Sequence, residues 1–149
     1  AGMSLSLENV DAFRTRFEEV VAARIEEHML TPKLNIDLEI DLDRITPKFM
    51  SLLKQFAPFG PENMNPVFVS RNLDAGDVQT MGADGSHLRF KPKQEGIPHS
   101  KLQAVAFKMG ALYDRLDAGS RFDMAYTIEE NHWNGRVYLQ LNVKDIKFC

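Results

Sequence analysis

RFDMAYTIEENHWNGRVYLQLNVKDI, residues 121–146, contains two segments of alternating apolar residues on either side of Asn134-Gly135. Alternation with period two gives each segment one buried face when it forms a strand. Asn-Gly is a strong hairpin signal, because both residues tolerate the positive φ of a type I′ turn. A two-residue turn fixes a register that pairs Trp133 with Arg136, Ile128 with Leu141 and Tyr126 with Val143. Apolar residues then face apolar residues across the strands, so the stretch predicts a β-hairpin.

The bulk composition is that of a globular protein without membrane spans. The chain has 149 residues, enough for one ordinary domain, and is 44% hydrophobic and 26% charged. No apolar run approaches the roughly 20 residues that a membrane span requires, and no signal-peptide pattern is present. The single cysteine, Cys149, excludes an internal disulfide and predicts a reducing, cytoplasmic location.

The net charge of −3 argues against a strongly basic nucleic-acid-binding protein, but the charge is unevenly placed. Residues 1–56 carry ten acidic and seven basic side chains, and residues 57–149 carry eleven of each. Within the second part, residues 86–108 hold five basic side chains against Glu95 alone. A local patch of this kind can bind polyanions even when the total charge is negative.

An amphipathic helix is expected over residues 7–29, with Ser6 as its N-cap. Its apolar residues recur at spacings of three and four and form one stripe: Val10, Phe13, Phe17, Val20, Val21 and Ile25. A single amphipathic helix needs a surface to pack against. Either the β-rich part of the chain or a domain outside this sequence supplies it.

Residues 34–42 alternate between apolar and mostly acidic residues, which predicts a strand with one acidic face. We interpret that face as solvated rather than as a metal site, because metal-binding carboxylates must converge on one point. Thr46-Pro47 then predicts a helix start, with Thr46 as N-cap. This helix is expected to reach Phe56 and to bury four side chains: Phe49, Leu52, Leu53 and Phe56.

Residues 57–68 are a rigid connector, since their three prolines and one glycine exclude a helix or a central strand. After it, the pattern predicts strands over residues 67–81, 87–91 and 102–107, a short helix over 110–116, and the hairpin. Short strands alone would also fit a sandwich. The helix between the third and fourth strands favours an OB-fold, a small Greek-key barrel. The predicted fold is therefore mainly β with flanking helices, an OB barrel preceded by a helix–strand–helix segment.

Several stretches together resemble the C-terminal part of the RecJ family of single-stranded-DNA-specific exonucleases. They are APFGPENMNPVF (57–68), DGSHLRF (84–90), VAFKMG (105–110), FDMAYTIEENHWNGR (122–136) and LQLNVKDI (139–146). The resemblance implies three parts: residues 1–30 as the last helix of a truncated DHH-associated domain, 31–66 as a strand–helix linker, and 67–149 as the OB-fold domain.

The resemblance also implies what this sequence does not contain. RecJ proteins degrade single-stranded DNA from the five-prime end, with manganese or magnesium held by Asp and His residues of an N-terminal DHH domain. No Asp-His-His sequence occurs here, so no catalytic or metal-binding residue can be carried over. The chain is expected to be a non-catalytic fragment that needs no cofactor of its own. Its expected partners are single-stranded DNA and the missing DHH and DHH-associated domains, with a single-stranded-DNA-binding protein as a further candidate.

The candidate DNA contacts are basic residues at period two on one outer strand face. His87, Arg89 and Lys91 alternate with Leu88 and Phe90, so the first three share a face away from the core. OB-folds bind single strands on their second and third strands and flanking loops, and Lys and Arg supply the phosphate contacts. The competing interpretation is an ordinary solvated face. The remaining cations assigned to this site are Lys93, Lys101, Lys108 and Arg136.

Trp133 and Tyr138 flank the hairpin turn and are expected to point outward. Trp133 is either a platform for base stacking or a cross-strand partner that packs on Arg136 through a cation–π contact. Phe90 shares the face of Leu88 and is assigned to the core, whereas Phe107 stays undecided between stacking platform and core.

No other chemistry is indicated. The four histidines lack metal-ligand spacing, no Ser-His-Asp or Cys-His arrangement is present, and the glycines form no phosphate-binding loop. The sequence therefore predicts a single-stranded-DNA-binding part of a RecJ-like exonuclease. The alternative is a structural or protein-interaction module that braces the catalytic domains, with little DNA binding of its own.

Overall fold

A computed structural model describes residues 2–98 and 101–149, apart from the side chains of residues 27, 28 and 133. The chain divides into two units, Ala1–Leu34 and Asn35–Cys149. The second unit contains all six strands of the described residues and the hydrophobic core.

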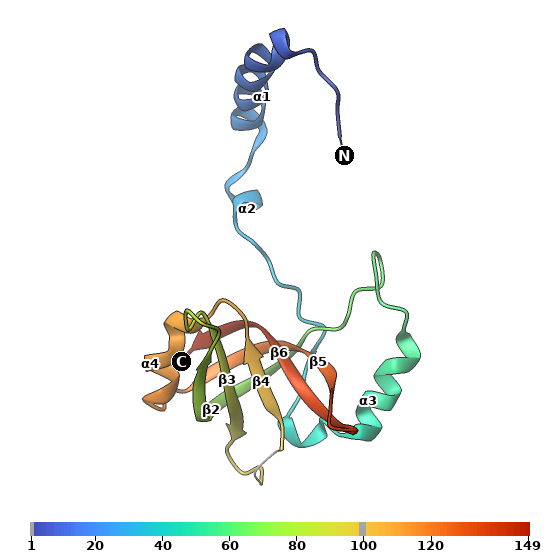
Figure 1. The fold of residues 1–149 in the computed structure, drawn as a ribbon, viewed down its shortest axis with the longest axis vertical. Helices are drawn as coiled ribbons and strands as arrows, with labels where there is room; N and C mark the ends of the chain where they lie inside the picture. The colour runs from blue at the N-terminus through green and yellow to red at the C-terminus, as the bar shows by residue number, and fades with distance from the viewer. Residues whose placement is uncertain (1, 99–100) are drawn as a thin grey trace. The chain divides into compact units, whose positions relative to one another are not determined.

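Five strands of the second unit form a closed barrel (Figure 1). They are β2 (Phe68–Met81), β3 (His87–Gln94), β4 (Gln103–Ala106), β5 (Phe122–Trp133) and β6 (Arg136–Phe148). Neighbours follow the order β2-β3-β4-β6-β5, and a β2–β5 pairing closes the ring. The β4–β6 pair is parallel and the others are antiparallel. This is the topology of an OB-fold and confirms the predicted fold class.

The hairpin forms with the register expected from its turn. Trp133 pairs with Arg136, Ile128 with Leu141 and Tyr126 with Val143. Asn134 and Gly135 have φ values of 48° and 71°, as a type I′ turn requires. A bulge between Ala125 and Tyr126 shifts the register beyond that point. One expectation fails near the turn, where Val137 is 54% exposed, because the barrel that buries Leu141 and Val143 does not extend to the end of the hairpin.

The core lies inside the barrel. Leu88 and Phe90 of β3 are fully buried, as the alternation predicts, and Phe90 packs edge-on against Phe122 with ring centroids 5.9 Å apart. A short 3-10 turn (Gly110–Leu112) and α4 (Tyr113–Asp117) follow β4, and Leu116 of α4 is fully buried at one end of the barrel (Figure 1). Gly110 lies so close to the Gly85 carbonyl that a side chain there would collide with it.

The strand predicted over residues 34–42 is much shorter. β1 is only Leu38–Glu39 and pairs in parallel with the start of β2. Ile40 and Leu42 are buried, but Leu34, Ile36 and Leu38 are 43–53% exposed. The chain turns into a 3-10 helix (Leu42–Arg44) once its pairing with β2 ends, so the apolar alternation continues past the part of the sheet that can cover it.

The acidic side chains of this segment are exposed, as predicted, and they also form hydrogen bonds to the barrel. Asp37 accepts a hydrogen bond from the Val67 backbone at 2.8 Å, and Glu39 accepts one from Arg71 at 2.7 Å. Gln94 of β3 donates to Asp41 at 2.8 Å and accepts from the Leu42 backbone at 2.9 Å. These contacts attach residues 37–42 to β2 and β3.

The second predicted helix starts where expected. In α3 (Pro47–Leu53), Thr46 caps the first turn by accepting from the Phe49 backbone at 3.2 Å. A 3-10 turn (Lys54–Phe56) follows. The predicted burial is only half right. Phe49 and Leu53 pack on the core, whereas Leu52 and Phe56 are 50% and 66% exposed because the helix touches the barrel along one side only.

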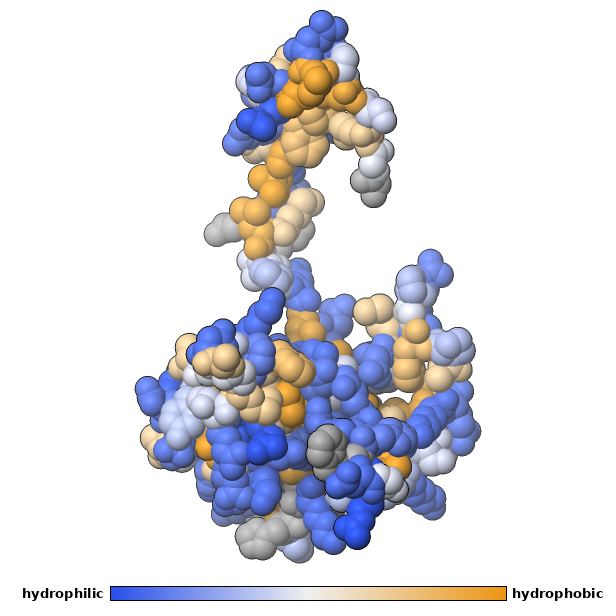
Figure 2. Space-filling model, viewed as in Figure 1, coloured by the Kyte–Doolittle hydropathy of each residue, from blue (hydrophilic) through white to orange (hydrophobic). Residues whose placement is uncertain are grey.

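The first unit departs most from its prediction. The expected helix is three pieces: a 3-10 turn (Leu7–Asn9), α1 (Val10–Arg24) and α2 (Glu27–Leu30). Ser6 makes no capping bond to the backbone and instead accepts from the Asn9 side chain at 2.9 Å. α1 has no buried residue, and apolar side chains gather along this unit (Figure 2). α1 ends at Ile25, whose backbone is extended. No helix among the described residues is long and apolar enough to cross a membrane.

Tyr126 should make stability depend on pH in alkaline solution. Its fully buried hydroxyl lies 2.7 Å from Ser70 Oγ, and burial raises its pKa to about 12. Between its unfolded and folded pKa values, the folded state therefore keeps a proton that the unfolded state has lost. We expect the free energy of unfolding to fall by roughly 1.4 kcal/mol per pH unit from this group above about pH 10.

The matched variant is Tyr126→Phe, which keeps the ring and removes the ionisable hydroxyl. Urea denaturation of both proteins at about pH 8 and about pH 11 measures the effect. The wild type should lose more stability than the variant over this interval. Equal losses would show that Tyr126 does not titrate in the way its burial requires.

Candidate nucleic-acid interface

A groove of about 450 Å³ lies on the outer surface of β3, β4, β5 and β6 and the loop before β4. We call it the basic groove, and it is lined by Arg89, Lys91, Lys101, Leu102, Gln103, Asn131, Tyr138, Leu139 and Gln140. Arg89 and Lys91 lie there because they alternate along β3 with the buried Leu88 and Phe90. The groove combines three cations, three amides and one tyrosine, and it contains no carboxylate among the described residues.

Two of the three groove cations are held by β2, the neighbouring strand. Arg89 donates to Gln79 Oε1 at 2.5 Å. Lys91 Nζ lies 2.6 Å from Asp77 Oδ2, and this hydrogen bond and charge hold the pKa of Asp77 below its usual value. Lys101 forms no ion pair with the described residues. Arg89 and Lys91 are thereby held along β3, and Lys101 lines the groove from the loop before β4.

The other predicted contact residues lie elsewhere. His87 Nδ1 accepts from the Lys108 backbone at 2.9 Å, and its ring packs edge-on against Phe107 with centroids 5.4 Å apart. These two contacts stabilise the turn after β4, so His87 has a structural role there. Lys93 lies across Gly76, beyond the groove, and Arg136 lies at the hairpin turn. The side chain of Trp133 is outside the described part of the chain, so neither of its two interpretations is tested.

Sequence reasoning missed the amides of the groove. Gln103, Asn131 and Gln140 line it together with Tyr138, and Asn131 donates to Gln140 Oε1 at 2.9 Å. The hairpin register contains the signal that would have found two of them. Tyr138 is paired with Asn131, and Gln140 follows Tyr138 at period two, so these side chains share its face. Amides donate and accept hydrogen bonds, which suits the edges of unpaired bases.

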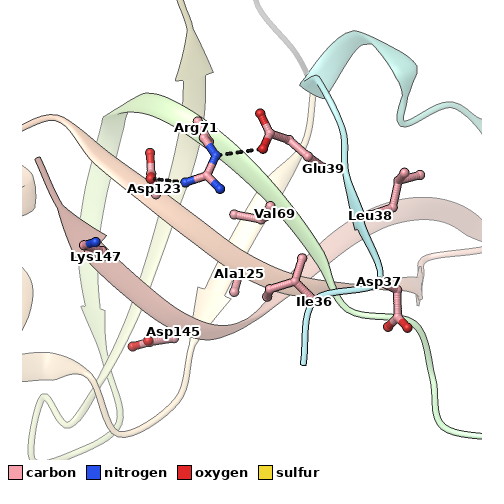
Figure 3. Close-up of a pocket in the computed structure, with 10 residues that line it drawn as sticks. All are labelled: Ile36, Asp37, Leu38, Glu39, Val69, Arg71, Asp123, Ala125, Asp145 and Lys147. Atoms are coloured by element: carbon pink, nitrogen blue, oxygen red, sulfur yellow. Dashed lines mark hydrogen bonds and ion pairs between the residues drawn. The ribbon is translucent and has the colours of Figure 1, made fainter. Parts of the chain in front are cut away.

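A second hollow, of about 400 Å³, lies over β1, β2, β5 and β6 (Figure 3). Arg71 lines it and lies between Glu39, at 2.7 Å, and Asp123, at 2.8 Å. These hydrogen bonds raise the pKa of the Arg71 guanidinium. Asp37 and Asp145 add two further carboxylates, against Lys147 alone. With Arg71 already paired to two carboxylates, this hollow repels a polyanion, and the basic groove is the stronger candidate for a nucleic-acid interface.

Metal chemistry has no candidate centre in the part of the chain that the structure describes. No group of three or more His, Cys, Asp or Glu side chains there could hold a metal ion. His99 lies outside the described residues, as does the side chain of His28. Cys149 is exposed, and its Sγ lies 3.9 Å from Asp123 Oδ1.

Comparison with known proteins identifies the relatives of this chain. A family model for the RecJ OB domain matches residues 36–145. The single-stranded-DNA-specific exonuclease RecJ of Bacillus subtilis is 30% identical over 145 residues, which are 97% of this chain and 18% of that protein. The RecJ protein of Haemophilus influenzae is 28% identical over 150 residues, covering 99% of this chain and 25% of that protein. The chain thus spans about a quarter or less of the length of these curated relatives.

Solved structures show the same fold. RecJ of Thermus thermophilus in complex with Mn²⁺ matches 98% of this chain and 20% of its own, with a TM-score of 0.73 and 20% identity. Its complex with Mg²⁺ matches 97% of this chain with a TM-score of 0.70. The family model covers most of the residues that form the barrel, and the strand order is that of an OB-fold. This chain belongs to the RecJ OB domain family.

Proposed function

We propose that this domain binds single-stranded DNA in the basic groove, as part of a RecJ-like exonuclease whose catalytic residues lie outside this sequence. The observation that carries the proposal is the clustering of Arg89, Lys91 and Lys101 beside Tyr138 and three amides. The three cations can bind phosphates, the tyrosine ring can stack on a base, and the amides can form hydrogen bonds with base edges. The groove lies on the second and third barrel strands and beside the last hairpin, where OB-folds bind single strands.

The neighbouring surface extends this arrangement. An apolar trough of about 470 Å³ shares Lys101, Leu102, Tyr138 and Leu139 with the basic groove and continues over Ile45 and Val137. Tyr138 is 48% exposed and stands between the two. A strand whose phosphates lie on β3 could therefore place unstacked bases against Tyr138 and the apolar trough. The relatives named as single-stranded-DNA-specific exonucleases support the choice of an unpaired strand over a duplex.

Salt dependence tests the proposal directly. We expect a labelled oligothymidylate to bind the protein at low salt, with an affinity that falls as salt rises. With two to three phosphate contacts, the log–log slope should lie between about −1.4 and about −2, since each single-strand contact contributes about −0.7. Fluorescence anisotropy over a range of salt concentrations measures this slope. Lack of binding at low salt, or binding that is indifferent to salt, would rule out the basic groove as a DNA site.

A bracing role is the second candidate, and one observation favours it. Exposed apolar side chains outside the basic groove include Ile36, Leu38, Phe56 and Met64 of the second unit and Phe17 of the first. Burying such residues against the rest of a longer protein would be favourable. In that case, the domain would hold the catalytic domains in place and salt would affect the contact only weakly.

A further inference from the structure

The extra residue of a β-bulge places a carboxylate on the edge of the basic groove. Gly76 of β2 pairs with Lys91 and Gln79 pairs with Arg89, so Asp77 and Val78 together stand opposite the single residue Phe90. Val78 is buried, and Asp77 points outward, where its carboxylate meets Lys91. The φ of Asp77 is 53°, a left-handed conformation that aspartate tolerates better than most residues.

The position of this carboxylate matters because of what it neutralises. Its Oδ2 lies 2.6 Å from Lys91 Nζ, with 56% of the lysine side chain and 63% of the aspartate side chain exposed. A phosphate oxygen binding Lys91 would take the same kind of place, with the same charge and similar hydrogen-bond geometry. Arg89 differs, since its partner Gln79 is neutral and leaves the arginine charge uncompensated.

We propose that Asp77 is an internal competitor for the phosphates of a bound strand, so that the basic groove grips DNA less tightly than its three cations would allow. The inference rests on the proposed DNA-binding function. When a phosphate reaches Lys91, the ion pair with Asp77 must open, and the carboxylate must return to solvent. The contribution of Lys91 to binding is therefore the difference between two ion pairs. A limited grip suits a strand that has to move through the site rather than stay on it.

The test compares four proteins in the anisotropy assay with a labelled oligothymidylate: wild type, Asp77→Asn, Lys91→Ala and the double variant. Asparagine tolerates the left-handed backbone, so the fold should be kept. We expect Asp77→Asn to bind about two- to fivefold more tightly, as the strength of an exposed ion pair implies. The salt slope should become steeper by up to about 0.7, because one more cation is free to replace counterions.

The double variant separates competition from a general charge effect. If Asp77 acts through Lys91, removing its carboxylate should bring little gain when Lys91 is already alanine. Asp145→Asn is the matched control, because it makes the same charge change at an exposed position in the hollow around Arg71. Asp77→Gly, which also suits a positive φ, should reproduce the gain of Asp77→Asn.

The outcomes are distinguishable. A gain that persists without Lys91, or that Asp145→Asn matches, overturns the competition at Lys91. Binding by the wild type with no gain in Asp77→Asn and Asp77→Gly overturns this inference and leaves the proposed function in place. No binding by any of the proteins at low salt overturns both.

Discussion

Reversing the charges of Arg89 and Lys91 is expected to reduce the affinity for single-stranded DNA about a hundredfold at moderate salt. A charge-assisted hydrogen bond to a phosphate contributes roughly 1.5–3 kcal/mol, so Arg89 supplies most of this factor, and Lys91, which first has to leave Asp77, adds less. The two glutamates would also repel the phosphate backbone. Fluorescence anisotropy of Arg89→Glu/Lys91→Glu against wild type measures the loss, and the remaining salt slope should fall towards the contribution of Lys101 alone.

The matched control is Lys48→Glu/Lys144→Glu. It makes the same change in net charge at two exposed lysines outside the basic groove, one in α3 and one in β6. This variant should bind within about twofold of wild type at moderate salt, where exposed charges more than about 10 Å apart are screened. If both double variants lose affinity equally, the domain responds to net charge and the groove is not its binding site. Circular dichroism of each variant confirms that the barrel is retained.

Truncating Phe90 should have the largest effect on stability, a loss of about 3–5 kcal/mol in Phe90→Ala. The ring is fully buried and meets Phe122 edge-on inside the barrel, so its removal leaves a cavity that the closed strands cannot easily fill. A domain of this size has a total stability of about 5–15 kcal/mol. The variant should therefore unfold at a much lower urea concentration, or fail to fold.

Phe107→Ala provides the comparison within the same region. Phe107 follows β4, is 51% exposed and meets the His87 ring in an edge-to-face arrangement, so we expect its removal to cost less than about 1 kcal/mol. Urea denaturation of both variants, fitted with a common slope, gives the two losses. Similar losses would mean that Phe107 is as much a part of the core as Phe90, against the exposure of its ring.

The elements that could be predicted from sequence are those fixed by local signals that agree with each other. Asn134-Gly135 sets the turn, the turn sets the register, and the alternation independently pairs Ile128 with Leu141. Thr46-Pro47 likewise carries both an N-cap and a helix start. The outward row of Arg89 and Lys91 followed from period two alone. In each case, the prediction depends only on residues that are close together in the sequence.

Features that depend on distant partners were missed or misjudged. The alternation of residues 34–42 does not show that only Leu38 and Glu39 form a strand paired with β2. The apolar stripe of α1 likewise does not show which surface the helix packs against. The sequence also did not show which side chains pair with the cations of the basic groove. Asp77 meets Lys91 because a bulge adds one residue to β2, and no period in the sequence marks that bulge.

The closure of the barrel by β2 and β5 has a consequence for how the chain folds. Phe68 pairs with Tyr126, and Gln103 of β4 pairs with Gln140 of β6, so the core needs contacts between residues far apart in the sequence. While the chain is being synthesised, β2, β3 and β4 would leave the ribosome before the strands that complete them. Until the last hairpin is synthesised, the apolar faces and unpaired edges of these strands stay uncovered. Topologies of this kind fold slowly and are prone to aggregation. The hairpin with the strongest local signals is thus also the element whose arrival allows the barrel to close.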